Sequence, residues 1–269
     1  MKTALTIAGS DCSGGAGIQA DIKSISANGV FAMSVITAIT VQNTMGVFDI
    51  QDVKPEIISG QIKSIFDDIK VDAVKIGMVS KIESIKAIAR SLRNIENLPP
   101  IILDPVMISK SGFKLLSDDA KETLINELFP LSTIITPNLP EAEEILGIKI
   151  TTLDQMKEAA YKLIELGPKN ILIKGGHLED DATDIFYDGD SIMYLNEGRI
   201  DTKNTHGTGC TLSSAIAANI AKGMDMRSAI IEAKKYITIA IKNGIELGHG
   251  VGPTNHFYEL YRRANKKIY

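Results

Sequence analysis

The sequence predicts an α/β fold in which a mainly parallel sheet is covered by helices on both faces. Short apolar runs of strand length alternate with segments of helical periodicity along most of the chain. Many of these runs are apolar throughout, which is typical of strands buried on both faces of a parallel sheet. The chain has 269 residues, of which 44% are hydrophobic and 23% are charged. This composition indicates a globular protein, and we expect one domain spanning residues 1–269.

The first part of the chain contains predicted strands that are each followed by a predicted helix. Ile18, Ile22 and Ile25 lie at helical spacing and predict the first helix, which Gly29 ends. The other helices follow from the same kind of periodicity. The predicted strands here cover residues 3–8, 31–42, 71–77 and 100–106, and the predicted helices cover residues 17–29, 55–69, 80–94 and 117–130.

The second part of the chain continues the alternation and then departs from it. Strands are predicted at residues 132–138 and 169–176, and helices at residues 139–147, begun around Pro140, and 151–167. Residues 184–195 contain two short runs around Asp188-Gly189-Asp190, which predict an antiparallel hairpin at the sheet edge. The chain from Thr211 onward is expected to be mostly helical.

Charge and terminal composition exclude several classes of protein. The formal charge of −4 and the pI of about 5.7 give no basic face for nucleic acid, so an anionic substrate must be held by local donors. The first residues, MKTALTIAGSDCSGG, lack the long apolar core of a secretory signal. No apolar run reaches the roughly 18 to 20 residues of a membrane span. With two unpatterned cysteines, we expect a cytoplasmic protein without membrane or nucleic-acid partners.

The segment THGTGCTLSSAIAANIAKG predicts a glycine-rich turn that opens a buried helix. Gly207 and Gly209 permit backbone conformations closed to other residues, and the small residues that follow are typical of a buried helix. The N–H groups of such a turn, with the helix dipole, point at an anion. A tight turn that only packs a helix on the sheet explains the segment equally well. It is not a P-loop, because the pattern GxxxxGK[ST] is absent from the chain.

Other polar residues follow predicted strands, and the carboxyl ends of such strands are where ligands bind in α/β sheets. Asp104, Asn138 and Glu141 are oxygen donors of the kind that Mg²⁺ selects, although carboxylates near helix starts are more often helix caps. Lys174 ends an apolar strand, where a solvated lysine is less expected, and this favours a phosphate contact. His177 and His206 show no metal-ligand spacing and are interpreted as structural or peripheral.

A second glycine-rich loop, SDCSGGAGIQAD, follows the first strand. It lacks the dinucleotide pattern GxGxxG, and the second strand ends in Gln42 rather than an acidic residue, which counts against a Rossmann oxidoreductase. The loop glycines allow the backbone to approach a small substrate. Asp21 and Gln42 are candidates for polar contacts, and an ordinary surface or cap role explains each of them equally well. Met78 and Val106 are candidate pocket walls.

These motifs, in this order, resemble the hydroxymethylpyrimidine/phosphomethylpyrimidine kinases of thiamine biosynthesis, a branch of the ribokinase-like superfamily. The matching segments, which span nearly the whole chain, are GSDCSGGAGIQAD, TAITVQNT, KIGM, LDPVM, TPNLPEAE, IKGGH, HGTGCTLSSAIAA and GHGVGPTNHF. The resemblance implies a three-layer α/β/α sandwich, usually a homodimer, that binds ATP and Mg²⁺ at the carboxyl edge of the sheet. It also implies phosphorylation of 4-amino-5-hydroxymethyl-2-methylpyrimidine and then of its monophosphate. Cys12 departs from the pattern, because proline is common at that position in this branch.

The resemblance also implies roles for individual residues. Gly207, Gly209 and Cys210 would form the anion hole for the transferred phosphoryl group, with Lys174 as a phosphate contact. The magnesium-bound nucleotide would be held by Asn138, Glu141, Lys174 and Thr208, with Asp104 and Glu141 in the metal environment. The pyrimidine pocket would be lined by Gly9, Asp21, Gln42, Met78 and Val106, and Gln42 would recognise ring nitrogens and the amino group.

The charge state of Cys210 stays open on the sequence. Most sugar kinases of the superfamily carry an aspartate base at this position. A helix N-terminus lowers the pKa of a thiol, whereas a neighbouring triphosphate raises it. Because phosphoryl transfer depends mainly on positioning and charge stabilisation, we expect the backbone N–H groups and Mg²⁺ to contribute more than the sulfur.

Three alternative functions remain. Pyridoxal kinases share the GTGC element, so pyridoxal is the competing substrate. A nucleotide-binding sensor without catalysis is disfavoured by the joint presence of Asp104, Glu141, Lys174 and Cys210. A Cys210-dependent hydrolase is weaker still, because His206, the nearby base, has no visible orienting partner in the sequence.

Overall fold

The computed structural model describes residues 1–108, 112, 115–116, 118–176 and 182–265. Across these residues the strands form one sheet with the order β3-β2-β1-β4-β5-β6-β7-β8-β9. β1 through β7, apart from β3, pair in parallel, whereas β3, β8 and β9 are antiparallel to their neighbours. The strands are β1 (Thr3–Asp11), β2 (Phe31–Asn43), β3 (Gly46–Asp52), β4 (Ala73–Ile76), β5 (Ile101–Leu103), β6 (Ile134–Ile135), β7 (Ile171–Ile173), β8 (Ala182–Tyr187) and β9 (Ile192–Glu197).

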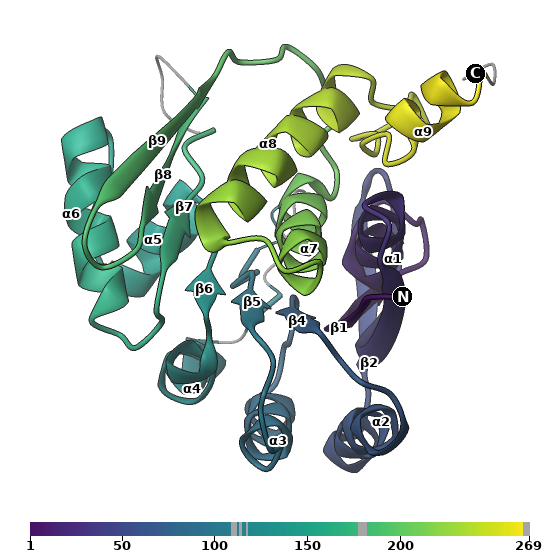
Figure 1. Cartoon of the computed structure of the whole chain (residues 1–269), viewed down its shortest axis with the longest axis vertical. Helices are drawn as coiled ribbons and strands as arrows, with labels where there is room; N and C mark the ends of the chain where they lie inside the picture. The colour runs from purple at the N-terminus through teal and green to yellow at the C-terminus, as the bar shows by residue number, and fades with distance from the viewer. Residues whose placement is uncertain (109–111, 113–114, 117, 177–181, 266–269) are drawn as a thin grey trace.

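Helices cover both faces of the sheet, so the predicted α/β/α sandwich is confirmed (Figure 1). α2, α3 and α4 lie on one face, and α1, α7 and α8 lie on the other. The helices are α1 (Gly17–Ala27), α2 (Pro55–Asp68), α3 (Ile82–Arg93), α4 (Asp118–Leu128), α5 (Leu139–Leu146), α6 (Leu153–Ile164), α7 (Thr208–Ala221), α8 (Met226–Lys242) and α9 (Tyr258–Arg263), with a 3-10 turn at Phe129–Leu131.

Alternate side chains of the central strands supply two separate cores. In β5, Ile101 and Leu103 pack into the core beneath α2, α3, α4 and α6, whereas Ile102 packs into the core beneath α7 and α8. This alternation follows from the two-residue period of a strand and explains why such strands are apolar at every position. The small residues of α7, among them Ala215 and Ala218, are buried, as the sequence predicted.

The hairpin predicted at residues 184–195 is confirmed as β8 and β9, with β9 at the sheet edge. β3, at the opposite edge, was not predicted. None of its residues is fully buried, so it lacks the apolar run by which the buried strands are recognised. β5 and β6 are shorter than predicted because the chain leaves the sheet at Asp104 and Thr136.

The order of the strands determines where ligands can bind. From β1 the chain moves outward to β2 and β3 and then returns to β4 on the other side of β1. A crevice outside the carboxyl ends of the strands is expected at such a switch point. The segments that directly follow β1, β4, β5, β6 and β7 all lie at the edge formed by the carboxyl ends of the strands. Within the described ranges, no helix is long and apolar enough to cross a membrane.

Candidate active site

A cavity of about 310 Å³ opens at the carboxyl edge of the sheet. It collects residues from loops that are far apart in the sequence. Of the predicted site residues, the cavity is lined by Gly9, Gln42, Met78, Asp104, Val106, Asn138, Glu141, Lys174, Gly207, Thr208, Gly209 and Cys210. The residues that the sequence assigned to one site therefore do lie around one cavity in the fold.

One end of the cavity is formed by the turn that begins α7. Gly207 is the N-cap of this helix and has a φ of 76°, a left-handed conformation that favours glycine. Its Cα also lies so close to the loop after β1 that an added Cβ would be 1.8 Å from the carbonyl oxygen of Gly15. Within the described chain no side chain caps the helix. The N–H of Thr208 donates to the carbonyl of Thr205 at 3.3 Å, and the N–H groups of Gly209 and Cys210 remain donors for an anion in the cavity.

Asp104 and Lys174 form an ion pair beside this turn. Lys174 Nζ lies 2.8 Å from Asp104 Oδ1, and the hydroxyl of Thr136 donates to the same oxygen at 3.1 Å. Burial works to lower the pKa of Lys174, but the carboxylates of Asp104 and Glu141 outweigh it and raise that pKa. A Cβ on Gly209 would lie 3.2 Å from both Lys174 Nζ and Asp104 Oδ2. The cation, the carboxylate and the helix N-terminus thus converge on one point.

Asn138 and Glu141 are helix caps that also line the cavity. The side chain of Asn138 accepts from the Glu141 N–H at 2.9 Å, and Glu141 Oε2 accepts from the Asn138 N–H at 2.8 Å, which completes a capping box for α5. Burial raises the pKa of Glu141 to about 7, with Lys174 opposing the shift and Asp104 adding to it. The capping interpretation is confirmed, and it leaves Glu141 Oε1 without a role in the box.

The structure gives a direction for Cys210, which the sequence left open. Burial raises the pKa of its thiol to about 11; the charge of Lys75 only partly opposes this, and the carboxylates of Asp21 and Asp104 add to it. At neutral pH the sulfur is therefore a neutral thiol in the protein without ligands.

The opposite end of the cavity is more apolar. Met78 and Val106 join Ala38 and Leu115 in a small cluster, and Gly9 lies so close that an added Cβ would be 3.0 Å from Met78 Sδ. Gln42 also lines the cavity, and its amide contacts His206 and Thr40. A planar ring with one polar edge matches these surroundings.

Asp21 is the one predicted pocket residue that the structure places elsewhere. It is fully buried in the core and does not line the cavity. Its carboxylate lies 2.8 and 2.9 Å from Lys75 Nζ and accepts from the hydroxyls of Thr6 and Ser214. Asp21 therefore joins β1, β4, α1 and α7 beneath the site.

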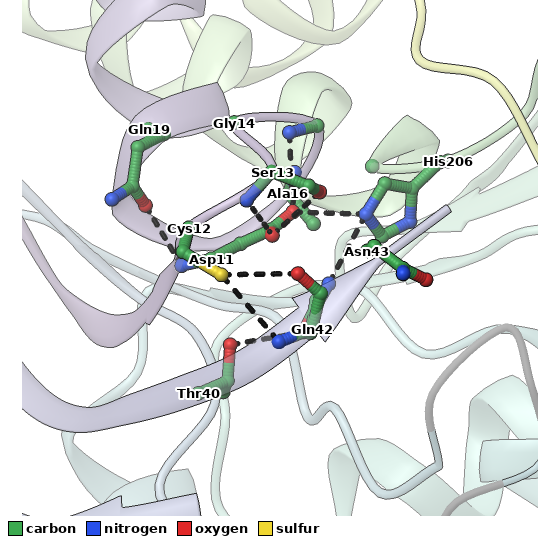
Figure 2. A network of polar contacts seen from close by, with 12 residues as sticks. Asp11, Cys12, Ser13, Gly14, Ala16, Gln19, Thr40, Gln42, Asn43 and His206 are labelled. Atoms are coloured by element: carbon green, nitrogen blue, oxygen red, sulfur yellow. Dashed lines mark hydrogen bonds and ion pairs between the residues drawn. The ribbon is translucent and has the colours of Figure 1, made fainter. Parts of the chain in front are cut away.

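Asp11 and His206 line the cavity and were missed as a pair. His206 was interpreted as structural or peripheral, but its ring reaches the cavity, with Nε2 lying 2.9 Å from Asp11 Oδ2 (Figure 2). Asp11 is therefore the orienting partner that the sequence did not reveal, since 195 residues separate the two. The available signal was that each precedes a glycine-rich turn. His177 lies outside the described residues.

A magnesium ion would need help from a nucleotide at this site. No group of three or more His, Cys, Asp or Glu side chains in the described ranges is arranged to hold a metal. Asp104 and Glu141 supply two carboxylates near the cationic Lys174. This donor set fits an ion such as Mg²⁺, which keeps several waters and shares phosphate oxygens with its substrate.

Comparison with known proteins shows the family to which the chain belongs. The family model described as phosphomethylpyrimidine kinase matches residues 11–255. A hydroxymethylpyrimidine/phosphomethylpyrimidine kinase of Rhizobium meliloti is 49% identical over 96% of this chain and 98% of its own length. A crystal structure of a phosphomethylpyrimidine kinase from Clostridium difficile has 51% identity and a TM-score of 0.81, covering 90% of this chain and 100% of that one. An ADP complex of a Bacillus subtilis pyridoxal kinase has 39% identity and a TM-score of 0.88, covering 97% and 99%. The chain therefore belongs to the phosphomethylpyrimidine kinase family, whose members are phosphotransferases of ribokinase-like fold.

Proposed function

We propose that this protein transfers the terminal phosphoryl group of ATP to 4-amino-5-hydroxymethyl-2-methylpyrimidine and then to the resulting monophosphate. The observation that carries the proposal is one cavity with two unlike ends. The N–H groups of Gly209 and Cys210, with Lys174, Asp104 and Glu141, form its polar part, and Met78 and Val106 form its apolar part, with Gln42 also in the lining. The name of the family and of its relatives supports the pyrimidine as the acceptor.

In this proposal the hydroxymethyl oxygen attacks the terminal phosphorus of ATP. The new O–P bond forms as the bond to the bridging oxygen breaks, and ADP leaves. Lys174 and the N–H groups at the start of α7 stabilise the charge on the transferred group, which is the main task in a loose phosphoryl-transfer transition state. Asp104 and Glu141 would hold Mg²⁺, which neutralises phosphate charge when bound.

The raised pKa of Cys210 supports the lesser role that we assign to its sulfur. A thiol with a pKa of about 11 is a poor proton acceptor at neutral pH. As the O–P bond forms, the hydroxyl proton passes to water or to an oxygen of the transferred phosphoryl group, so the step needs no strong base from the protein. We propose that Cys210 acts mainly through its backbone N–H and its position in the turn.

The second transfer uses the same cavity. Its acceptor is a phosphate oxygen of the monophosphate, so the reacting anion has to lie beside the same turn as the hydroxyl did. The ring then shifts along the apolar end while its polar edge stays near Gln42. We also propose a homodimer; the exposed apolar side chains along β2 and β3, including Phe31, Val41 and Phe48, are compatible with an interface at that edge.

Pyridoxal kinase activity is the second candidate. A pyridoxal kinase of Bacillus subtilis shares the fold closely, so the phosphoryl end of the cavity does not discriminate between the two acceptors. The difference must come from the ring end, where Gln42 and Met78 lie. Both acceptors are hydroxymethyl heterocycles, but only the aminopyrimidine offers a ring nitrogen beside an amino group.

The test is ADP release measured with each acceptor alone and then in direct competition. Release with the pyrimidine and its monophosphate, and preference for the pyrimidine over pyridoxal, is the expected result. A Lys174→Met variant serves as the control for contaminating kinases and should lose release with every acceptor. Preference for pyridoxal in competition would overturn the proposal.

A further inference from the structure

His206 lies between two side chains that make opposite demands on its ring. Nε2 is 2.9 Å from Asp11 Oδ2 and 3.2 Å from the amide nitrogen of Gln42 (Figure 2). A ring nitrogen either carries a hydrogen or accepts one, so it cannot satisfy a carboxylate and an amide N–H together. One of these two contacts must therefore be made by a different atom from the one shown in Figure 2.

Asp11 settles which state the ring nitrogen takes. Its Oδ1 accepts from the backbone N–H and the hydroxyl of Ser13, and its Oδ2 accepts from the N–H groups of Gly15 and Ala16. Although burial opposes the shift, the hydrogen bonds from His206 and Ser13 lower the pKa of Asp11 to about 2. A carboxylate surrounded by donors has no hydrogen to give, so Nε2 of His206 carries one.

The amide of Gln42 must then turn its oxygen toward His206. As placed, the amide oxygen lies 3.1 Å from Thr40 Oγ1, but the hydroxyl of Thr40 already donates to the carbonyl of Ser10 at 2.9 Å. Rotating the amide by half a turn puts its nitrogen beside Thr40, which can accept, and its oxygen beside His206. Every group then meets a complementary partner, and amide oxygen and nitrogen are assigned on such grounds.

The imidazole ring that enforces this choice is held rigidly. Its Cδ2 packs tightly against the loop after β1, since a Cβ on Gly15 would be 2.3 Å from that atom. The backbone N–H of His206 donates to the carbonyl of Gly252 at 3.0 Å. The side chain is 13% exposed and its carboxylate partner 3%. The ring therefore has little freedom to follow the amide.

From this geometry we infer that Asp11 and His206 are positioning residues that fix the carboxamide orientation of Gln42. Its oxygen faces His206 and its nitrogen faces Thr40, which leaves one lone pair and one N–H for the cavity. The free N–H donates to the ring nitrogen of an aminopyrimidine, and the free lone pair accepts from its amino group. A ring with the reversed edge, an N–H beside a carbonyl, would place donor against donor and acceptor against acceptor. An amide that is free to rotate would accept that reversed edge as well. This inference rests on the proposed function, because it names what selects the aminopyrimidine.

The test compares the aminopyrimidine with its 4-oxo analogue, in which the polar edge is reversed. For the unsubstituted protein, kcat/KM should favour the amino compound by about tenfold or more, and in His206→Leu by less than about threefold, because a mismatched buried hydrogen bond changes affinity on that scale. His206→Gln, which places an amide N–H near the former Nε2, should keep the preference. His249→Leu, a change of an exposed histidine in the loop before α9, is the matched control.

A purely structural role for His206 would lower both rates together and leave their ratio unchanged. An unchanged ratio in His206→Leu would therefore overturn the inference. If that variant fails to fold, the His206→Gln variant and a spectroscopic test on the unsubstituted protein still decide. Nitrogen-15 NMR should find Nε2 of His206 protonated at neutral pH, with the side-chain amide hydrogens of Gln42 close to Thr40. An unprotonated Nε2, or amide hydrogens close to the imidazole, would contradict it.

These readouts also separate the inference from the proposed function. Absence of pyrimidine turnover by the unsubstituted protein would refute the proposed function. The NMR result would then still decide the orientation of Gln42, because it needs no substrate.

Discussion

Replacing Lys174 by methionine tests whether the charges at the phosphoryl end act as one unit. The pair with Asp104 is separated by 2.8 Å, and its side chains are 15% and 2% exposed. At an effective dielectric constant of about 20, this separation corresponds to an attraction of about 6 kcal/mol before desolvation is counted. Methionine fills a similar volume but leaves the carboxylate of Asp104 with the hydroxyl of Thr136 as its hydrogen-bonding partner.

We expect Lys174→Met to lower the free energy of unfolding by about 3–5 kcal/mol, because a buried carboxylate loses its counter-charge. Asp104→Asn added to it should cost less than the sum of the two single changes, by a coupling of about 1–3 kcal/mol. Lys149→Met is the matched control: its ion pair with Glu143 leaves the lysine 86% exposed, and we expect a loss below about 1 kcal/mol. Urea unfolding and kcat/KM would be measured on all four variants. A Lys174→Met variant as stable as the control would refute the reasoning.

Three further predictions concern residues around the cavity. Cys210→Ala should bind nucleotide normally and keep turnover within about 100-fold of the unsubstituted protein, the lower end of general-base effects; complete loss in a stopped-flow assay would give the sulfur the larger role. The folded-state pKa of Asp11 is lowered to about 2. Its charge therefore stabilises the fold above the ordinary pKa of an aspartate, and this stabilisation is lost as the pH falls toward about 2. Asp11→Asn should therefore cost about 2 kcal/mol at neutral pH, and the gap in unfolding free energy should close between about pH 4 and about pH 2; a constant gap would argue against the ionised state. Lys75→Met should destabilise by about 3–5 kcal/mol, since Asp21 would remain buried, and thermal unfolding close to that of the unsubstituted protein would contradict it.

The sequence predicted the sheet and most of the cavity for one physical reason. Buried parallel strands are apolar on both faces, so Ile101–Leu103 and Ile171–Ile173 stand out, and the polar residues that follow them must share an edge. That rule placed Asp104 and Lys174 together without any knowledge of their contact. The edge strand β3 was not predicted, because an antiparallel edge strand without buried residues has no such apolar run.

Contacts between side chains that are far apart in the sequence could not be predicted. Asp21 follows a glycine-rich loop and so resembled a pocket residue, but the partner that draws it into the core, Lys75, lies 54 residues away on β4. The hydrogen bond between Asp11 and His206 spans an even longer separation. Neither spacing nor periodicity encodes which side chain a buried carboxylate will meet.

The most direct test of the proposed activity is to resolve the products by mass. The purified protein would receive ATP, Mg²⁺ and 4-amino-5-hydroxymethyl-2-methylpyrimidine, with its monophosphate and pyridoxal supplied in separate reactions. We expect the pyrimidine to give the monophosphate first and the diphosphate afterwards, and the added monophosphate to give the diphosphate directly. Phosphate on pyridoxal with none on either pyrimidine compound would contradict it.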